Sequence, residues 1–249
     1  MTSELNEKIY SKVFGESNER YNIVQKEKFE RIVDLFEPCG RVLDVGCGDG
    51  WFGRRIIEDF GADVHGVDIS EDALKIAESS GLKVKKQDLD GTELAYPNNH
   101  FDAVLCGDII EHLLNTEFFL KEIRRVLKKN GFLILSVPNI AAYYNRLLLL
   151  TGKFPLGIES ASELVFPPVK VKELYNTGHV RAYTKETITK LIVYHGFRIE
   201  NVKGAPMVIH TDYLVDKFKK YLRIANALER FFARFPTLAS IILVKARKV

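Results

Sequence analysis

Cysteine is scarce in this sequence, and the three that occur do not form a recognisable set. Cys39, Cys47 and Cys106 are odd in number, and no two of them have C-x-x-C spacing. A disulfide framework needs pairs and a thiolate zinc site needs short spacings, so the pattern argues against both and indicates a reducing compartment. No residue is therefore assigned as a metal ligand.

Long apolar runs and a large excess of one charge are also absent. An apolar run such as residues 147–150 is far shorter than the ~20 residues of a membrane-spanning helix. The first ten residues lack the apolar segment of a signal peptide. The 36 lysines and arginines nearly balance 33 aspartates and glutamates, which argues against a nucleic-acid partner. The sequence predicts a cytoplasmic protein.

What the sequence does have is a regular alternation of strand and helix patterns. Strand-like segments occur at 41–45, 63–68, 83–89, 101–107, 132–138, 197–204 and 238–246. Helix-like segments occur at 21–36, 51–60, 70–81, 116–129 and 185–195. This alternation predicts an α/β fold, a doubly wound and mostly parallel sheet with helices on both faces. Thr184 is the expected N-cap of the last of these helices, in a capping box left incomplete by Thr187.

Two irregular segments interrupt this alternation, at 140–180 and 205–236. We interpret them as substrate-side insertions over the C-terminal edge of the sheet, where ligands of open α/β folds bind. They belong to a single domain, 1–249, that begins with a helical lead-in at 1–40. The stretch 212–235 interleaves apolar and basic residues, which is typical of a lid helix and also of weak contact with an anionic membrane surface.

The stretch "RVLDVGCGDGWFG", residues 41–53, places a glycine-rich turn directly after a strand. Read from Gly48 it spells G-x-G-x-x-G, and Asp68 stands 20 residues later, as in dinucleotide-binding enzymes. Read from Gly46, where the strand ends, the glycines are one residue too short for that fingerprint. Asp44 and Asp49 also flank the turn with negative charge, which repels a pyrophosphate and favours a cationic adenosyl ligand.

Several motifs then follow in order along the chain: "VLDVGCGDG", "GVDIS", "QDLDGTELAYPNNHFDAVLCGDIIEHL", "FLKEIRRVLKKNGFLILSVPN" and "RAYTKETITKLIVYHGFRI". Together they resemble class I S-adenosylmethionine-dependent methyltransferases of the small-molecule and glycan-pathway type, a group that includes the ubiquinone and menaquinone methyltransferases. The resemblance implies a Rossmann-like sheet of seven strands whose last strand is antiparallel. It also implies S-adenosylmethionine as cofactor and S-adenosylhomocysteine as product.

The resemblance assigns a set of cofactor-binding residues. The methionine part of the cofactor lies against Gly46, Cys47, Gly48, Asp49 and Gly50, and its amino group meets Asp44. The adenosine part lies against Asp68, which binds the ribose hydroxyls, and against Ile69, Asp88 and Leu89. The pocket closes near the sulfonium at Cys106 and Gly107.

Two histidines are candidate catalytic residues. His112, in "GDIIEHLL" with Asp108 and Glu111, follows the fourth strand at the sheet edge where a substrate would arrive. It suits a general base for an acceptor hydroxyl, and it equally suits a packing role. His179, in "GHVRAYT" with Arg181 and Tyr183, resembles an H-x-R-x-[FY]-T pattern of methyltransferases, a substrate-side polar cluster. The alternative is a capped helix start.

The sequence therefore predicts methyl transfer, specifically O-methylation of a small molecule or of a glycan or lipid-linked acceptor. Two alternatives stay open. A nicotinamide-dependent Rossmann oxidoreductase would bind a dinucleotide at the same loop, and a non-catalytic S-adenosylmethionine-binding protein would keep the pocket without turnover.

Overall fold

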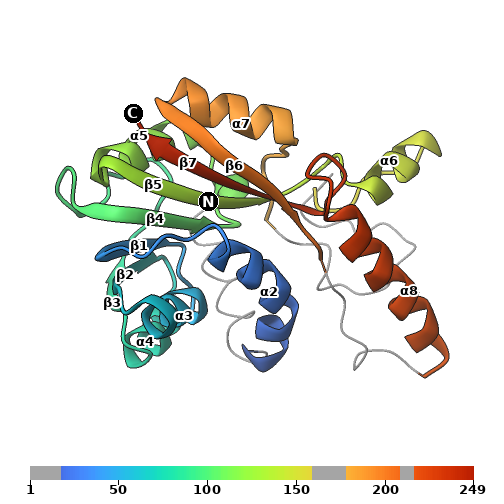
Figure 1. Ribbon diagram of the computed structural model, residues 1–249, viewed down its shortest axis with the longest axis horizontal. Helices are drawn as coiled ribbons and strands as arrows, with labels where there is room; N and C mark the ends of the chain where they lie inside the picture. Colours follow the sequence, from blue (N-terminus) through green and yellow to red (C-terminus); the bar gives the residue numbers. More distant parts are fainter. Residues whose placement is uncertain (1–17, 159–177, 208–215) are drawn as a thin grey trace.

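The computed structural model describes residues 18–158, 178–207 and 216–249, with only the backbone described for 18–25 and 216–222. In these ranges seven strands form one sheet in the order β3-β2-β1-β4-β5-β7-β6 (Figure 1). The strands are β1 (Arg41–Val45), β2 (Asp63–Asp68), β3 (Lys83–Lys86), β4 (Phe101–Gly107), β5 (Leu127–Pro138), β6 (Phe197–Ala205) and β7 (Ile241–Lys248). The helices are α2 (Asn18–Val33), α3 (Trp51–Phe60), α4 (Glu71–Ser79), α5 (Thr116–Val126), α6 (Tyr143–Leu150), α7 (Lys185–Tyr194), α8 (Asp216–Phe232) and the 3₁₀ turn η1 (Ile110–His112).

The sheet is parallel except for one strand. β1 pairs in parallel with both β2 and β4, and β4 pairs in parallel with β5. β7 runs antiparallel between β5 and β6. The predicted Rossmann-like, doubly wound sheet with an antiparallel last strand is confirmed.

Helices cover both faces of the sheet, and each face has its own apolar core (Figure 1). α5 and α7 lie on one face, where Phe119, Ile123 and Ile188 are buried against the strands. α2, α3 and α4 lie on the other face, where the buried side chains include Ile32 and Ile56. Since both faces are covered, the central strands β1 and β4 are buried along nearly their whole length, as is typical of parallel sheets.

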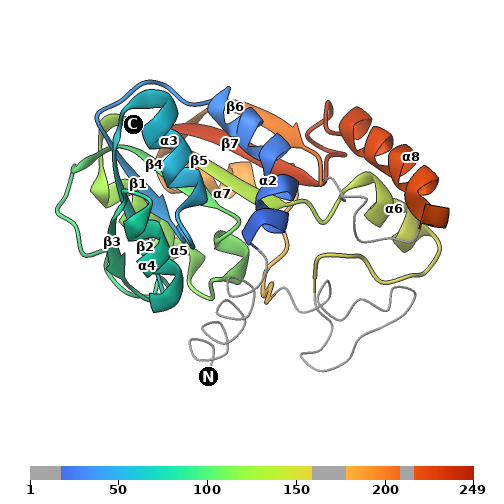
Figure 2. The ribbon, with the colours of Figure 1, turned by 90° about the horizontal axis from the view of Figure 1, so that it is seen from below.

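The described parts of the two insertions lie together at one end of the molecule. α6 follows β5, and α8 precedes β7; the two helices are neighbours in both views (Figures 1 and 2). The Tyr143 ring of α6 stacks on the Phe232 ring of α8, with 4.2 Å between the ring centroids. Residues 159–177 and 208–215 of the predicted insertions, and 1–17 of the lead-in, are outside the described residues.

Two helix ends differ from the sequence-based prediction. The helix predicted over 116–129 ends at Val126, and β5 begins at the next residue. Leu127 pairs with Phe101 and is fully buried, so the sheet core takes the residue that helical periodicity had included. The lead-in helix predicted over 21–36 ends at Val33, and Leu35 and Phe36 continue the buried face beyond it in a turn.

Candidate functional site

The glycine-rich turn between β1 and α3 has a backbone that requires glycine. Gly46, Gly48 and Gly50 have φ angles of 71°, 52° and 79°, in the left-handed region that other residues rarely adopt. A Cβ on Gly46 would lie 2.9 Å from Ile109 Cδ1, and one on Gly50 would lie 2.8 Å from Ala77. All three glycines thus shape the turn by their conformation, and Gly46 and Gly50 also by close approach.

The fourth glycine of the stretch has a different function. Gly53 lies inside α3, where a Cβ would lie 2.5 Å from Leu82 Cδ2. It serves helix packing and does not belong to the turn. The glycines of this stretch with a left-handed backbone are therefore Gly46, Gly48 and Gly50.

Three carboxylates surround this turn and are almost entirely buried. Asp44, Asp49 and Asp68 are 3%, 9% and 9% exposed. Asp68 accepts hydrogen bonds from the Gly48 N–H and the Ser70 N–H, both at 2.9 Å, and so ties the turn to the end of β2. Among the described residues, Asp44 Oδ2 has no hydrogen-bond partner.

The three acids make the pocket electrostatically favourable for a cation. Burial raises the pKa of Asp44 to about 7, and the neighbouring Asp68 and Asp49 carboxylates add to the effect. Burial also raises the pKa values of Asp49 and Asp68. A positive group in this pocket would relieve the repulsion and favour the ionised forms of all three.

The predicted adenosine-side residues gather along the same sheet edge. Ile69 is half-buried directly after β2, and Asp88 and Leu89 follow β3. The Gln87 N–H donates to the Asp68 carbonyl at 2.8 Å, which joins the two strand ends. Leu89 is buried, whereas Asp88 is partly exposed. The structure thus brings the two predicted acids, Asp68 and Asp88, to one edge.

The two predicted site cysteines are buried thiols. Cys106, beside Gly107 at the end of β4, pairs with Val45 of β1 across the sheet. Burial raises the pKa of the Cys47 and Cys106 thiols well above the usual value. Both are therefore protonated at neutral pH, which fits packing and excludes a nucleophilic thiolate.

A buried lysine that the sequence did not single out reaches this edge from α2. Lys28 is 1% exposed, and its ammonium lies 2.5 Å from Asp108 Oδ2. The Ser136 hydroxyl donates to the other Asp108 oxygen at 2.6 Å, and Asp108 has a φ of 53°. The start of the segment that carries His112 is thus held in one conformation by α2 and β5.

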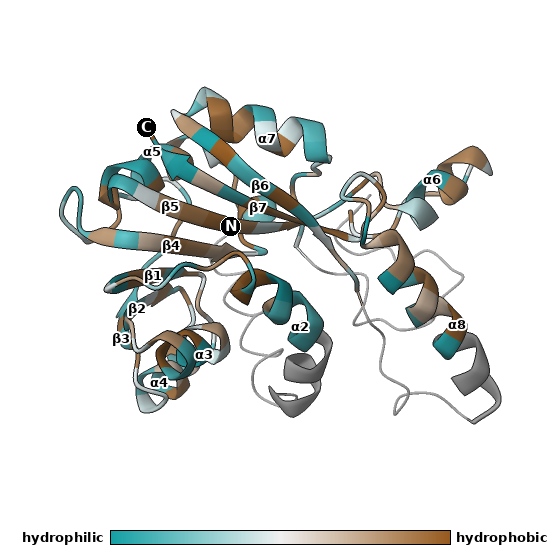
Figure 3. Ribbon diagram, viewed as in Figure 1, coloured by the Kyte–Doolittle hydropathy of each residue, from teal (hydrophilic) through white to brown (hydrophobic). Residues whose placement is uncertain are grey.

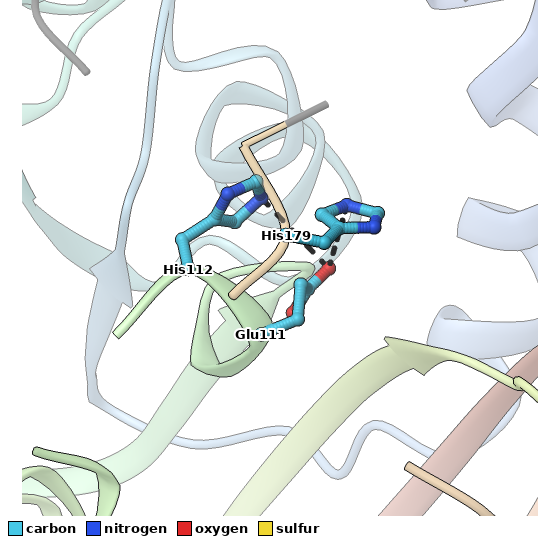
Figure 4. A group of neighbouring side chains, drawn as sticks. All are labelled: Glu111, His112 and His179. Carbon is cyan, nitrogen blue, oxygen red and sulfur yellow. Dashed lines mark ion pairs between the residues drawn. The ribbon is translucent and has the colours of Figure 1, made fainter. Parts of the chain in front are cut away.

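The two candidate catalytic histidines, 67 positions apart in the sequence, meet around a third side chain. Glu111 Oε1 lies 3.8 Å from His179 Nε2 and 4.0 Å from His112 Nε2 (Figure 4). Both imidazole rings and the carboxylate are mostly or fully buried, at 11%, 9% and 1% side-chain exposure. Burial, followed by the neighbouring His179, lowers the pKa of His112 to about 4, so its imidazole is neutral at neutral pH.

Arg181 holds the two segments of this cluster together. Its guanidinium donates to the carbonyl oxygens of Leu113, at 3.2 Å, and of Leu114. The backbone N–H groups of Val180 and Arg181 donate to the Glu111 carbonyl at 2.9 and 3.1 Å. Arg181 is therefore a positioning residue for the cluster, and Tyr183 is buried in the core beside α7.

The comparisons with known proteins agree with this geometry. Residues 43–135 match the protein-family model described as "Methyltransferase domain". Phosphoethanolamine N-methyltransferase 2 of Caenorhabditis elegans is 33% identical over 107 residues, covering 41% of this chain and 24% of that protein. Ubiquinone biosynthesis O-methyltransferase of Rhizobium leguminosarum is 29% identical over 147 residues, covering 55% of this chain and 58% of that protein. The chain thus spans less than two thirds of each relative.

Solved structures share the fold over nearly the whole chain. A SAM-dependent methyltransferase from Archaeoglobus fulgidus matches with a TM-score of 0.60 at 20% identity, covering 96% of this chain and 98% of that one. A SAM-dependent methyltransferase from Thermotoga maritima, a possible histamine N-methyltransferase, matches with a TM-score of 0.63 at 19% identity, covering 97% and 99%. Among the described residues, none of the helices has the length and apolar composition needed to cross a lipid bilayer.

Proposed function

Because the chain carries a class I S-adenosylmethionine-dependent methyltransferase domain, we propose that it transfers a methyl group from S-adenosylmethionine to an oxygen atom of a small or lipid-linked acceptor. The observation that carries the proposal is the turn at Gly46–Gly50 with its three buried carboxylates. It suits a ligand with positive charge and no phosphate.

The residues of the turn fit this cofactor. Asp44 Oδ2 is buried without a hydrogen-bond partner among the described residues, which is costly unless a donor reaches it. The ammonium of the cofactor supplies such a donor. The turn backbone has no side chain at Gly46, Gly48 and Gly50, so a ligand can approach it closely. A pyrophosphate at the same place would face three carboxylates, which argues against the nicotinamide alternative.

Different residues around the turn would bind different parts of the cofactor. Asp44, Asp49, Cys47 and the three glycines hold the methionine part, and Cys106 and Gly107 border the sulfonium. Asp68 has accepted two backbone bonds, and each of its oxygens retains a lone pair for a ribose hydroxyl. Ile69, Asp88 and Leu89 hold the adenine. When bound, the cofactor supplies an activated methyl group, and much of the rate enhancement comes from aligning the acceptor with it.

The acceptor side favours an oxygen nucleophile with an apolar body. His112 and His179 meet around Glu111 in the segment that follows β4, and we place there the step in which an acceptor hydroxyl loses its proton. Figure 3 shows apolar residues along α6 and in the coloured part of α8. The exposed large apolar side chains of these helices include Leu147, Leu150, Ile224 and Phe231. Such a surface suits a lipid-linked acceptor.

Cofactor titration by calorimetry tests the pocket. The variants Asp68→Ala and Gly48→Val are expected to lose measurable S-adenosylmethionine binding, because one removes the tie between turn and ribose site and the other forces a β-branched residue to positive φ. Glu58→Gln, on the exposed side of α3, is the control and binds as the wild type does. Wild-type titration curves for both pocket variants would contradict the assignment.

Turnover is tested separately, by mass spectrometry of S-adenosylhomocysteine formed with each acceptor of a panel. The proposal expects product with a phenolic acceptor that carries an isoprenoid chain, and little with phosphoethanolamine. Cofactor binding without product across oxygen and nitrogen acceptors would favour the non-catalytic alternative. Tight binding of NAD in place of S-adenosylmethionine would favour the oxidoreductase.

A further inference from the structure

Glu111, His112 and His179 form a cluster that the cofactor pocket does not explain. One ligand-type atom from each side chain lies within 4.8 Å of the other two (Figure 4). His112 and Glu111 come from η1 after β4, whereas His179 comes from the segment that precedes α7. The fold therefore builds the cluster from two separate parts of the chain.

Both imidazole rings present the same nitrogen to the carboxylate. His112 Nδ1 lies 3.2 Å from the Gly178 carbonyl oxygen, and His179 Nδ1 lies 2.8 Å from the Gly157 carbonyl oxygen. Because a carbonyl oxygen only accepts, each Nδ1 carries a proton, and Nε2 is the atom of each ring that faces Glu111. A hydrogen bond from Nδ1–H to a backbone carbonyl is the arrangement that orients metal-ligating histidines.

Glu111 gives the second, independent observation. Its side chain is 1% exposed, and neither carboxylate oxygen has a hydrogen-bond partner among the described residues. A buried carboxylate without a hydrogen bond is costly, and native structures rarely retain one without a reason. A cation held between this carboxylate and the two neighbouring imidazole rings would satisfy Glu111.

We propose that Glu111, His112 and His179 bind one divalent transition-metal ion of the Zn²⁺ or Mn²⁺ class. Two donors on one such ion, each ~2.0–2.2 Å from it, lie at most about 4.4 Å apart. The two imidazole–carboxylate separations, 3.8 and 4.0 Å, fall within that limit. All three ligand atoms lie within 4.8 Å of one another, so binding the ion requires at most a small inward rotation of the imidazole rings. Two nitrogens and one oxygen favour these ions over Mg²⁺ and Ca²⁺, which prefer oxygen ligands throughout.

The chemical role of the ion rests on the proposed function. Ile109, two residues before Glu111, lies against Gly46 of the turn, so the cluster is close to the proposed cofactor site. We place the ion on the acceptor side of that site. Three protein ligands leave a position for an acceptor hydroxyl, whose pKa a bound cation lowers. The hydroxyl proton passes to solvent, the oxygen bonds to the methyl carbon, and the electrons of the broken carbon–sulfur bond return to sulfur.

Metal titration of the full chain tests the site without any activity measurement. The protein is stripped with EDTA, freed of chelator and titrated with ZnCl₂ or MnCl₂ by calorimetry, and CoCl₂ spectra report the ligand set. Wild type is expected to saturate at one ion per chain. Glu111→Gln and His179→Gln are each expected to weaken binding at least ~tenfold. The matched control is His100→Gln, at the other end of β4 and remote from the cluster.

Unfolding of the variants is monitored by circular dichroism, and Glu111→Gln is expected to stay folded because it removes a buried charge. Absence of saturable binding by folded wild type would overturn the proposal, as would ligand variants that bind the ion as tightly as wild type. The S-adenosylmethionine titration is run on the stripped protein. Cofactor binding without metal binding would reject the metal site alone, and the reverse result would reject the proposed function alone.

Discussion

At the scale of single residues, Asp44 shows how burial changes the pKa of a carboxyl group. It is 3% exposed on β1, and burial raises its pKa to about 7. The unfolded chain releases this proton near pH 4, whereas the native state keeps it up to about pH 7. The stability that the protonated Asp44 carboxyl contributes to the native state is therefore fully present below pH 4 and is lost as pH rises through 7.

We expect Asp44→Asn to remove this loss of stability at high pH, because asparagine does not ionise. Each pKa unit corresponds to about 1.4 kcal/mol and the pKa of Asp44 is raised by about three, so at pH 8 the variant should be more stable than wild type by on the order of 4 kcal/mol, with little difference at pH 4. Urea unfolding of the cofactor-free protein at pH 4, 6 and 8 measures this. Glu58→Gln, an exposed carboxylate, serves as control. Parallel stability curves for Asp44→Asn and wild type would contradict the prediction.

The residues that the sequence could not predict depend on contacts between distant positions. Lys28 and Asp108 are 80 positions apart and form a buried ion pair only because α2 packs across the end of β4. A lysine beside the apolar positions Phe29 and Ile32 was the one available signal. Glu111 likewise gives no sign in the sequence that His179 faces it. The glycines and acids of the turn were predictable because they are consecutive.

At the scale of secondary-structure elements, α7 shows how a local motif can be satisfied by an unexpected residue. Thr184 accepts a hydrogen bond from the Thr187 N–H at 3.2 Å, and the Thr184 N–H donates to the Thr187 hydroxyl at 2.8 Å. The prediction that the capping box is incomplete is therefore wrong. A threonine hydroxyl at the third position reaches the N-cap backbone, as Glu or Gln would.

Thr184→Ala is expected to destabilise the protein by about 1 kcal/mol, because it leaves the first-turn N–H of α7 without its acceptor. Thr187→Glu retains both bonds of the box and should stay within about 0.5 kcal/mol of wild type. Thr189→Ala on the same helix, which removes a hydroxyl that donates to the Lys185 carbonyl, is the control. Equal urea midpoints for Thr184→Ala and this control would exclude a capping contribution.

The order and type of elements were predictable because local periodicity determines them. α3, β2 and β4 have the predicted bounds. The end of α5 was not predictable, because Leu127 fits the helical pattern and the sheet equally well. The pairing of Leu127 with Phe101 in the sheet decides in favour of the strand. Helical propensity does not include such a tertiary contact.

At the scale of the whole molecule, α6 and α8 form an apolar end that the sheet does not cover. Leu150 of α6 is 83% exposed, and Phe231 of α8 is 48% exposed. Arg223 and Arg234 are exposed on or next to α8. The structure therefore describes the side chains of residues 223–235 of the predicted amphipathic stretch, and both apolar and basic ones lie at the surface. Residues 212–215 are outside the described part of the chain.

We expect the double variant Leu150→Ser and Phe231→Ser to raise KM for a lipid-linked acceptor about tenfold, because complete burial of each side chain is worth roughly 1.5–3 kcal/mol and contact buries only part of it. KM for a truncated, water-soluble acceptor should change little. Val193→Ser on α7, which also removes an exposed apolar side chain, is the control. Equal losses with both acceptors would exclude a surface that recognises the lipid.

The position of β7 has a consequence for how the chain is made. β6 pairs only with β7 in the described sheet, and β7 fills the place between β6 and β5. On the ribosome, α7 and β6 emerge before the strand that joins them to the rest. At ~5–20 residues per second, synthesis of the segment from the end of β6 to the end of β7 takes a few seconds. During that time the apolar outer edge of β5 is exposed, so the nascent chain is most vulnerable to aggregation just before its last strand is complete.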